Sequence, residues 1–266
     1  MGRTPFYLVG PSPWPFCTAS SVLGMAFGFV MWVWGKEGVL SGMGGIDLIM
    51  LGLLSLLLSL GQWWRDVSRE SRVGFHTSYV EKAMWDGFIL FLASEVMFFF
   101  SLFWALGHMS LAPDAGVNCV WPPIGIRTMK PWKVPLLGTV ILLSSGATMK
   151  YAHLAVKVCS KKDMAVGLML TMSYAIMFMC LQGFEYYWSS FTIMDSVFGG
   201  CFYILTGFHG MHVTFGFCFM SVMLCRVLRG HFTAKKHVVF KMCSWYWHFV
   251  DWVWVGLYVI LYVWSF

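Results

Sequence analysis

The most unusual chemical feature of the sequence is a carboxyl group near the middle of a long apolar run. The run is Phe88–Leu106, nineteen residues in which Glu95 is the single ionisable side chain. A helix rises about 1.5 Å per residue, so this run would cross about 28 Å, close to the hydrocarbon thickness of a bilayer. A charged carboxyl at that depth costs at least about 2.5 kcal/mol and therefore needs a proton, a partner or water. Glu95 is either a proton-relay or regulatory group, or a structural group hydrogen-bonded between helices.

Two histidines three residues apart, His209 and His212, form the second candidate. On one face of a helix, they could present two imidazoles to a metal ion. However, no motif supplies a third ligand nearby, and polar side chains also join membrane helices through hydrogen bonds. We therefore interpret both histidines as structural. The same interpretation applies to His248, near a helix end, and to Asp251, which must be paired or face water.

Basic and polar side chains in the segments between apolar runs suggest a third kind of site. Guanidinium and imidazolium groups at headgroup depth suit a phospholipid phosphate, and a carboxylate suits an ammonium headgroup. The candidate lipid-binding residues are Arg65, Arg69, Glu70, His76, Arg226, Lys236 and His237. The alternative is membrane topology alone, in which positive charge stays on one side of the bilayer. That alternative explains the lysines and arginines but not Glu70 or the histidines.

These side chains must be positioned by membrane-spanning helices. The chain has 266 residues, of which 59% are apolar and 11% charged, whereas soluble domains carry about 25% charged residues. Seven apolar runs predict an all-α, polytopic bundle of seven transmembrane helices, in one domain covering residues 1–266. The expected helices cover about residues 18–34, 46–64, 84–106, 134–151, 164–184, 197–224 and 239–263, with a polar loop at 65–82. The net charge of +6 lies between the apolar runs, so a nucleic-acid surface is not expected.

The distribution of basic residues predicts the orientation. With seven spans, fourteen of the eighteen Lys and Arg residues fall on the side of the N-terminus. Cytoplasmic and matrix segments of membrane proteins are rich in these residues. The sequence also lacks an amphipathic presequence, which favours a mitochondrial protein encoded in the organelle. We therefore expect a multi-pass protein of the mitochondrial inner membrane, with its N-terminus on the matrix side and its C-terminus in the intermembrane space.

Several motifs together resemble one family. In chain order they include Gln62–Val67 (QWWRDV), Ser94–Phe99 (SEVMFF), Trp121–Ile126 (WPPIGI), Thr206–Gly210 (TGFHG) and Trp245–Asp251 (WYWHFVD). Each motif is short. Their order over seven predicted spans is nevertheless similar to that of subunit III of haem–copper cytochrome c oxidase.

The resemblance implies a specific architecture. Subunits of this family have seven transmembrane helices, two of which are split from the other five by a V-shaped, lipid-filled cleft. They hold no redox metal, because haem and copper belong to partner subunits, so His209 and His212 match a structural segment. The family's intramembrane carboxylate, known for its reactivity with carbodiimide, falls on Glu95. Its phospholipid contacts would fall near Arg69, Glu70, His76 and Arg226.

The resemblance also implies a role. The chain would be a non-catalytic core subunit of the respiratory enzyme that passes electrons from cytochrome c to O₂ and pumps protons. It would stabilise the haem–copper subunit, support oxygen access and proton uptake, and bind phospholipids such as phosphatidylglycerol, phosphatidylethanolamine or cardiolipin. Its expected partners are subunits I and II and accessory subunits, and no cofactor or metal is expected in the chain itself. The alternatives are the equivalent subunit of a quinol oxidase, and a free-standing proton-coupled transporter that uses Glu95.

The chain departs from the family pattern in two places. Where the family usually has Gly-Leu-Arg just before the third helix, this chain has Ala83–Asp86 (AMWD). Where the family often has a histidine pair at the end of the fourth helix, this chain has His153 followed by Leu154. The first change puts in doubt any headgroup or partner contact that the arginine carries.

Overall fold

The computed structural model describes residues 10–34, 43–234 and 236–265, and within these ranges the chain is all-helical, without strands. The α-helices are α1 (Trp14–Trp34), α2 (Met43–Val73), α3 (Ser78–Leu111), α4 (Val134–Lys157), α5 (Lys161–Tyr187), α6 (Val197–Leu228) and α7 (Val238–Leu257). A short 3-10 helix, η2 (Ala115–Val117), follows α3, and α7 continues into a π-helical segment, η3 (Tyr258–Val263). Three of the counted basic residues, Arg3, Lys36 and Lys235, lie outside the described ranges.

The helices have the length and composition of membrane spans. Among the described residues, α1, α2, α3, α5, α6 and α7 with its π-helical extension are long and apolar enough to cross a bilayer. This result confirms the all-helical, polytopic membrane fold. α4 has 24 residues, contains Lys150 and ends at Lys157, and it is not among these candidate spans. The seventh span and the single domain therefore stay predictions.

The expected loop at 65–82 is wrong at both ends, because only residues 74–77 connect α2 and α3. α2 continues through this charged stretch to Val73, because the stretch contains no glycine or proline. Gly74 then adopts φ +95°, a conformation that glycine accepts readily at the end of a helix. The amides of Gly74 and Phe75 bond back to the carbonyls of Ser71 and Glu70, at 3.3 Å each, and cap the helix. α3 to α6 also extend past their predicted limits, and α5 begins with the charged residues Lys161 and Lys162.

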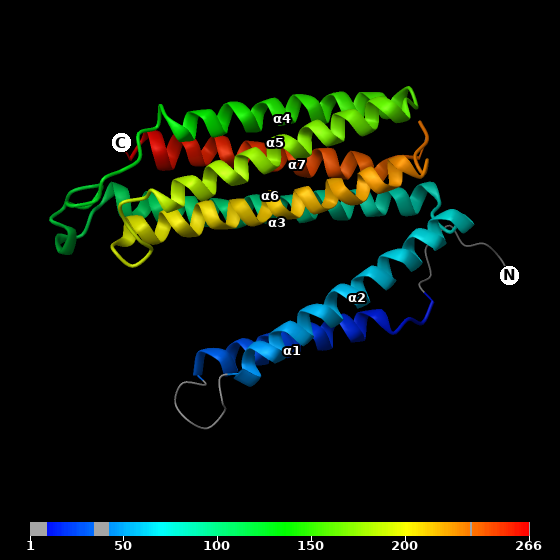
Figure 1. Cartoon of the computed structure of the whole chain (residues 1–266), viewed down its shortest axis with the longest axis horizontal. Helices are drawn as coiled ribbons and strands as arrows, with labels where there is room; N and C mark the ends of the chain where they lie inside the picture. Colours follow the sequence, from blue (N-terminus) through cyan, green and yellow to red (C-terminus); the bar gives the residue numbers. More distant parts are fainter. Residues whose placement is uncertain (1–9, 35–42, 235, 266) are drawn as a thin grey trace. The chain divides into compact units, whose positions relative to one another are not determined.

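The chain forms two compact units, Met1–Met84 and Trp85–Phe266, and the division falls inside α3. In the first unit, α1 and α2 pack side by side (Figure 1). A Cβ atom on Gly45 would lie 2.5 Å from the Trp32 backbone nitrogen, so only glycine permits this approach of the two backbones. The Ser55 hydroxyl donates a hydrogen bond to the Ser21 hydroxyl at 2.8 Å. Small residues and a polar contact thus join the pair, as is typical of membrane helices.

The second unit is a bundle of α3 to α7. The α4–α5 and α6–α7 connections lie at one end, and the α3–α4 connection and the C-terminus at the other (Figure 1). Two buried tryptophans fix the rotation of α7 through side-chain hydrogen bonds to α4. The indole N–H of Trp247 donates to the Ser145 hydroxyl at 2.9 Å, and that of Trp254 donates to the Thr139 hydroxyl at 3.0 Å. A Cβ atom on Gly216 of α6 would lie 2.8 Å from the Trp247 ring, so this glycine provides space for the indole.

Candidate functional site

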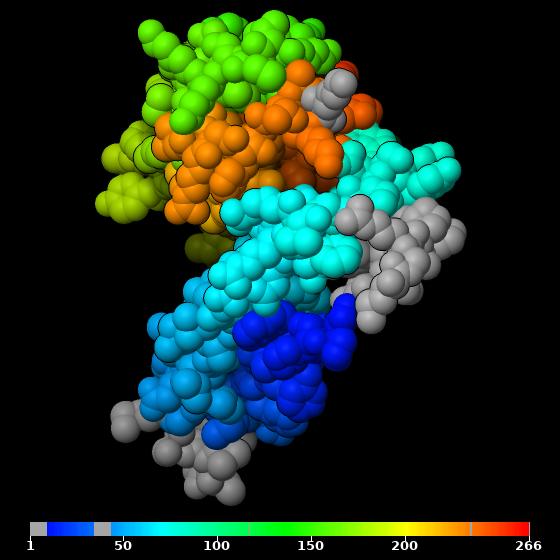
Figure 2. All heavy atoms as spheres, turned by 90° about the vertical axis from the view of Figure 1, so that its right-hand side faces the viewer, coloured from blue at the N-terminus to red at the C-terminus, as the bar shows by residue number. Residues whose placement is uncertain are grey.

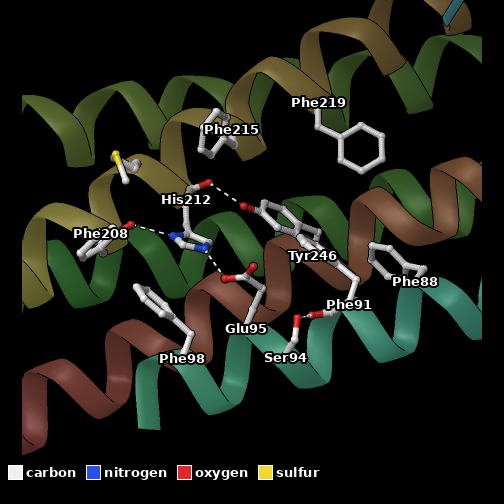
Figure 3. Close-up of a pocket in the computed structure, with 11 residues that line it drawn as sticks. Phe88, Phe91, Ser94, Glu95, Phe98, Phe208, His212, Phe215, Phe219 and Tyr246 are labelled. Carbon is white, nitrogen blue, oxygen red and sulfur yellow. Dashed lines mark hydrogen bonds and ion pairs between the residues drawn. The ribbon is translucent and has the colours of Figure 1, made fainter. Parts of the chain in front are cut away.

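The structure gives Glu95 a partner on another helix. The carboxyl group on α3 lies 2.9 Å from Nε2 of His212 on α6, 117 residues further along the chain (Figure 3). Nδ1 of the same imidazole lies 2.7 Å from the Phe208 carbonyl. The Glu95 and His212 side chains are 23% and 11% exposed, so the pair is largely removed from solvent. The two residues that the sequence suggested separately therefore form one site.

The hydrogen bonds of His212 determine where a proton can lie. A backbone carbonyl can only accept, so Nδ1 must donate to Phe208. In a neutral ring Nε2 would then accept a proton from a protonated Glu95, and in a charged ring it would donate to the carboxylate. Both arrangements leave one shared proton and no net charge on the pair. This neutrality removes most of the cost of placing Glu95 in the middle of a membrane helix.

Aromatic side chains surround the pair. The imidazole of His212 packs against Phe99, with ring centroids 5.0 Å apart, and against Tyr246 at 6.4 Å. Glu95 borders a pocket of about 800 Å³. The remaining lining is mostly phenylalanine (Figure 3), contributed by Phe88, Phe91, Phe98, Phe208, Phe215 and Phe219. The site therefore consists of one neutral polar pair beside an apolar space.

The second histidine of the pattern lies against a different helix. His209 is 1% exposed, and its Nε2 lies 3.3 Å from the Val250 carbonyl of α7. Its ring is packed against Phe178 and Trp254, at centroid distances of 5.6 and 5.1 Å. His209 and His212 thus bond in different directions. Within the described ranges no group of three or more His, Cys, Asp or Glu side chains could hold a metal ion.

A second carboxyl–imidazole pair occurs within α7. Oδ2 of Asp251 lies 3.6 Å from Nδ1 of His248, one turn away, which is longer than an ordinary hydrogen bond. A Cβ atom on Gly146 of α4 would lie 2.6 Å from that same Oδ2. Oδ1 of Asp251 is buried without a hydrogen-bond partner among the described residues. Packing against a glycine, rather than a strong bond, therefore holds this carboxyl group.

The proposed lipid-binding side chains are divided between the two units. In the first unit, the Arg65 and Arg69 guanidinium groups lie 3.1 and 3.8 Å from Oδ1 of Asp66. Oδ2 of Asp66 accepts a hydrogen bond from the Trp14 indole at 2.9 Å. Glu70 also lies on α2, and His76 follows in the connection to α3. One carboxylate thus partly neutralises the two arginines.

The remaining three lipid candidates lie around the α6–α7 connection. The guanidinium of Arg226, in the last turn of α6, lies 5.1 Å from the centre of the Phe232 ring. The backbone amide of Lys236 donates to the Thr233 hydroxyl at 3.1 Å. His237 occupies the N-cap position of α7. The sequence therefore grouped side chains that the structure distributes over several elements.

One buried acid was not among the predicted site residues. Glu185, in the last turn of α5, is 4% exposed and accepts a hydrogen bond from the Tyr262 hydroxyl at 2.9 Å. Its position one residue beyond the predicted end of the helix favoured an exposed location. The available signal was that Gln182, Glu185 and Tyr186 also match the pattern of the family that the sequence resembles.

The fold and these sites define a polytopic helical membrane protein in which polar side chains such as Glu95 and His212 pair between helices. The family model described as Cytochrome c oxidase subunit III matches residues 4–266. The chain is 46% identical to cytochrome c oxidase subunit 3 of Triticum aestivum over 264 residues, covering 99% of this chain and 97% of the relative. It is 45% identical to cytochrome c oxidase subunit 3 of Equus asinus over 261 residues, covering 98% and 97%.

The chain belongs to the cytochrome c oxidase subunit III family. It is therefore a membrane-embedded subunit of an oxidase complex, which confirms the function expected from the motifs. The quinol oxidase and transporter alternatives are not favoured, because the matching relatives are cytochrome c oxidase subunits.

Proposed function

We propose that this chain supports the haem–copper subunit of a mitochondrial cytochrome c oxidase without taking part in a chemical step. Subunits I and II would carry the haem and copper, and accessory subunits would surround them. The observation that carries the proposal is the internal pairing of Glu95 with His212 at 2.9 Å. A carboxyl group whose proton is already shared within the chain suits a structural role better than an exposed relay.

The apolar pocket beside Glu95 suggests how the support is given. A space of about 800 Å³ lined mainly by phenylalanine suits an acyl chain of a phospholipid. Ordered lipid there would keep a continuous apolar phase, into which O₂, an apolar molecule, partitions from water. The pocket beside Glu95 would therefore hold structural lipid and also support oxygen access. By keeping the lipid in place beside the haem–copper subunit, the chain would also support fast proton uptake by that subunit.

The charge distribution supports the proposed orientation. In the second unit, the end with the α4–α5 and α6–α7 connections carries lysines and arginines from four helices, whereas the α3–α4 connection carries Arg127, Lys130 and Lys133. The positive-inside rule assigns the more basic end to the matrix, and an alternation of seven spans would put the N-terminus on the same side of the membrane. The C-terminus would then face the intermembrane space. The V-shaped, lipid-filled cleft implied by the family resemblance, and the lipid contacts of Arg65, Arg69, Glu70, His76, Arg226, Lys236 and His237, remain parts of this proposal.

The test compares the purified oxidase complex with and without this chain. We expect the same haem absorbance spectrum and a similar initial rate of cytochrome c oxidation in both. The complex that lacks the chain should lose activity progressively during turnover, and adding phospholipid back should not restore it. Equal activity of the two complexes over many turnovers would contradict the support role, and an altered haem spectrum would contradict the non-catalytic assignment.

A further inference from the structure

Four basic side chains of the second unit, none of them part of the Glu95 site, converge between the end of α4 and the start of α7. The rings of His153 on α4 and His237 at the N-cap of α7 lie edge to face, with centroids 6.2 Å apart. Lys157 follows His153 by one turn, and Lys241 follows His237 by one turn. The positively charged Lys157 and Lys241 lie near His153. We call His153, Lys157, His237 and Lys241 the basic cluster.

The basic cluster has no acid in direct ionic contact in the part of the chain that the structure describes. None of its members takes part in an ion pair there. Neither imidazole makes a hydrogen bond within the same ranges, and Nδ1 of His237 is buried without a partner. Lysine charges that converge on one place repel each other, and an anion between them removes this repulsion.

Membrane topology alone does not explain this arrangement. The positive-inside rule concerns the number of lysines and arginines in a segment, and it leaves each side chain free to extend into water. Lys241 is instead held in place, because its Nζ lies 3.7 Å from the centre of the Trp85 ring. Trp85 in turn packs edge-on against Trp245, at a centroid distance of 5.4 Å. Lys241 of the cluster is therefore positioned by an aromatic contact with α3.

The location of the cluster limits what it can bind. Lys157 is the last residue of α4 and His237 precedes α7, so the cluster lies at the end of the bundle. Figure 2 looks onto this end, where the α4–α5 region lies beside the α6–α7 connection. Ammonium and imidazole N–H groups converging at a membrane surface suit the oxygens of a phosphate group.

We propose that the basic cluster is a binding site for a phosphate group. The phosphate would come either from an anionic phospholipid headgroup or from free phosphate in the adjoining aqueous phase. His237 is shared with the lipid-binding proposal above, whereas His153, Lys157 and Lys241 are assigned here from geometry. The phosphate site depends on the proposed function only if a bound phospholipid supplies the phosphate.

The test uses the purified, delipidated oxidase complex that contains this chain. Inorganic phosphate binding is measured by phosphorus NMR, and retention of added phosphatidylglycerol by native mass spectrometry. The test variant is Lys157→Gln/Lys241→Gln. The matched control is Lys161→Gln/Lys162→Gln, which removes two charges at the same end of the bundle, from the start of α5. The haem spectrum and subunit content of each preparation establish that the complex is assembled.

We expect the test variant to bind inorganic phosphate at least about tenfold more weakly than the wild type and the control, because two charge-assisted hydrogen bonds are lost. If the lipid is the source, the variant also retains less phosphatidylglycerol, and inorganic phosphate competes with the lipid in the wild type. If free phosphate is the source, phosphatidylglycerol retention is unchanged. Equal phosphate binding in all three complexes would overturn the proposal.

A milder variant covers the case in which the double variant fails to assemble. His153→Gln removes one imidazole and no lysine, and it should weaken phosphate binding without changing subunit content. Unchanged binding in an assembled His153→Gln complex would also overturn the proposal. A complex without this chain that keeps full activity during turnover would contradict the support role but not the phosphate site, so the two failures are distinguishable.

Discussion

The second unit contains two carboxyl–imidazole pairs that differ in how they are held. Glu95 and His212 join two helices across 2.9 Å, and the imidazole is fixed by a second hydrogen bond to Phe208. Asp251 and His248 belong to one helix and lie 3.6 Å apart, with the histidine side chain 38% exposed. The first pair depends on a hydrogen bond, whereas the second carboxyl group depends on packing. A buried acid can therefore be held in a membrane bundle in two different ways.

The largest expected effect comes from a variant that disturbs the packing of Asp251 against Gly146. In Gly146→Ala the new Cβ atom would lie 2.6 Å from Oδ2 of Asp251, so α4 and α7 must separate or the carboxyl group must move. Overpacking of this kind costs about 1–3 kcal/mol. We expect a lower thermal midpoint of the assembled complex and less of this chain retained in it. Gly183→Ala is the control, because a Cβ there meets nothing within 4 Å; equal losses in both variants would contradict the packing role.

The next largest effect is expected when the hydrogen bond between Glu95 and His212 is removed. His212→Leu leaves the Glu95 carboxyl group without its partner in an apolar region, which costs about 1–3 kcal/mol. The thermal midpoint of the complex should fall. His248→Leu should lower it less, because the Asp251 contact is long and the histidine is partly exposed. If the two variants lowered the midpoint equally, the distinction between the pairs would be lost.

A smaller effect is expected when the carboxyl group of Glu95 is replaced by an amide that can still form the hydrogen bond. In Glu95→Gln the amide can donate to Nε2 of His212, so the helix-to-helix bond persists and stability should change by less than about 1 kcal/mol. Turnover of the complex should change only modestly. A loss of proton pumping as large as that caused by removing a catalytic ligand would show that Glu95 acts as a relay.

The smallest effect is expected for Asp251→Asn. The amide has the shape of the carboxyl group and makes the same contact with Gly146, so the packing is conserved. The thermal midpoint should stay close to that of the wild type and above that of Gly146→Ala. A drop as large as the one caused by Gly146→Ala would mean that charge, rather than shape, holds Asp251.

One departure from the family pattern has a structural counterpart. The chain has Trp85 and Asp86 where the resemblance implies an arginine. In this chain Lys241 of α7 lies 3.7 Å from the centre of the Trp85 ring. A positive charge thus reaches α3 from a neighbouring helix. A single sequence cannot predict this, because the two residues are joined only through packing.

The sequence by itself determined the class of protein. Long apolar runs predict membrane helices because backbone polar groups in hydrocarbon must be bonded within the segment. Motifs such as Ser94–Phe99 and Trp245–Asp251 then identified the family. The ends of the helices were predicted less well, because α2 continues through charged residues that are not apolar but still favour helix until Gly74.

Only the tertiary structure decided which polar groups meet. Glu95, His209 and His212 were all candidates from their residue types, but which of them pair depends on how each helix is rotated about its axis. That rotation follows from side-chain packing between distant segments, such as Gly216 against Trp247 and Ser145 bonded to the same indole. For this reason His212 bonds Glu95 while His209, one turn away, faces α7.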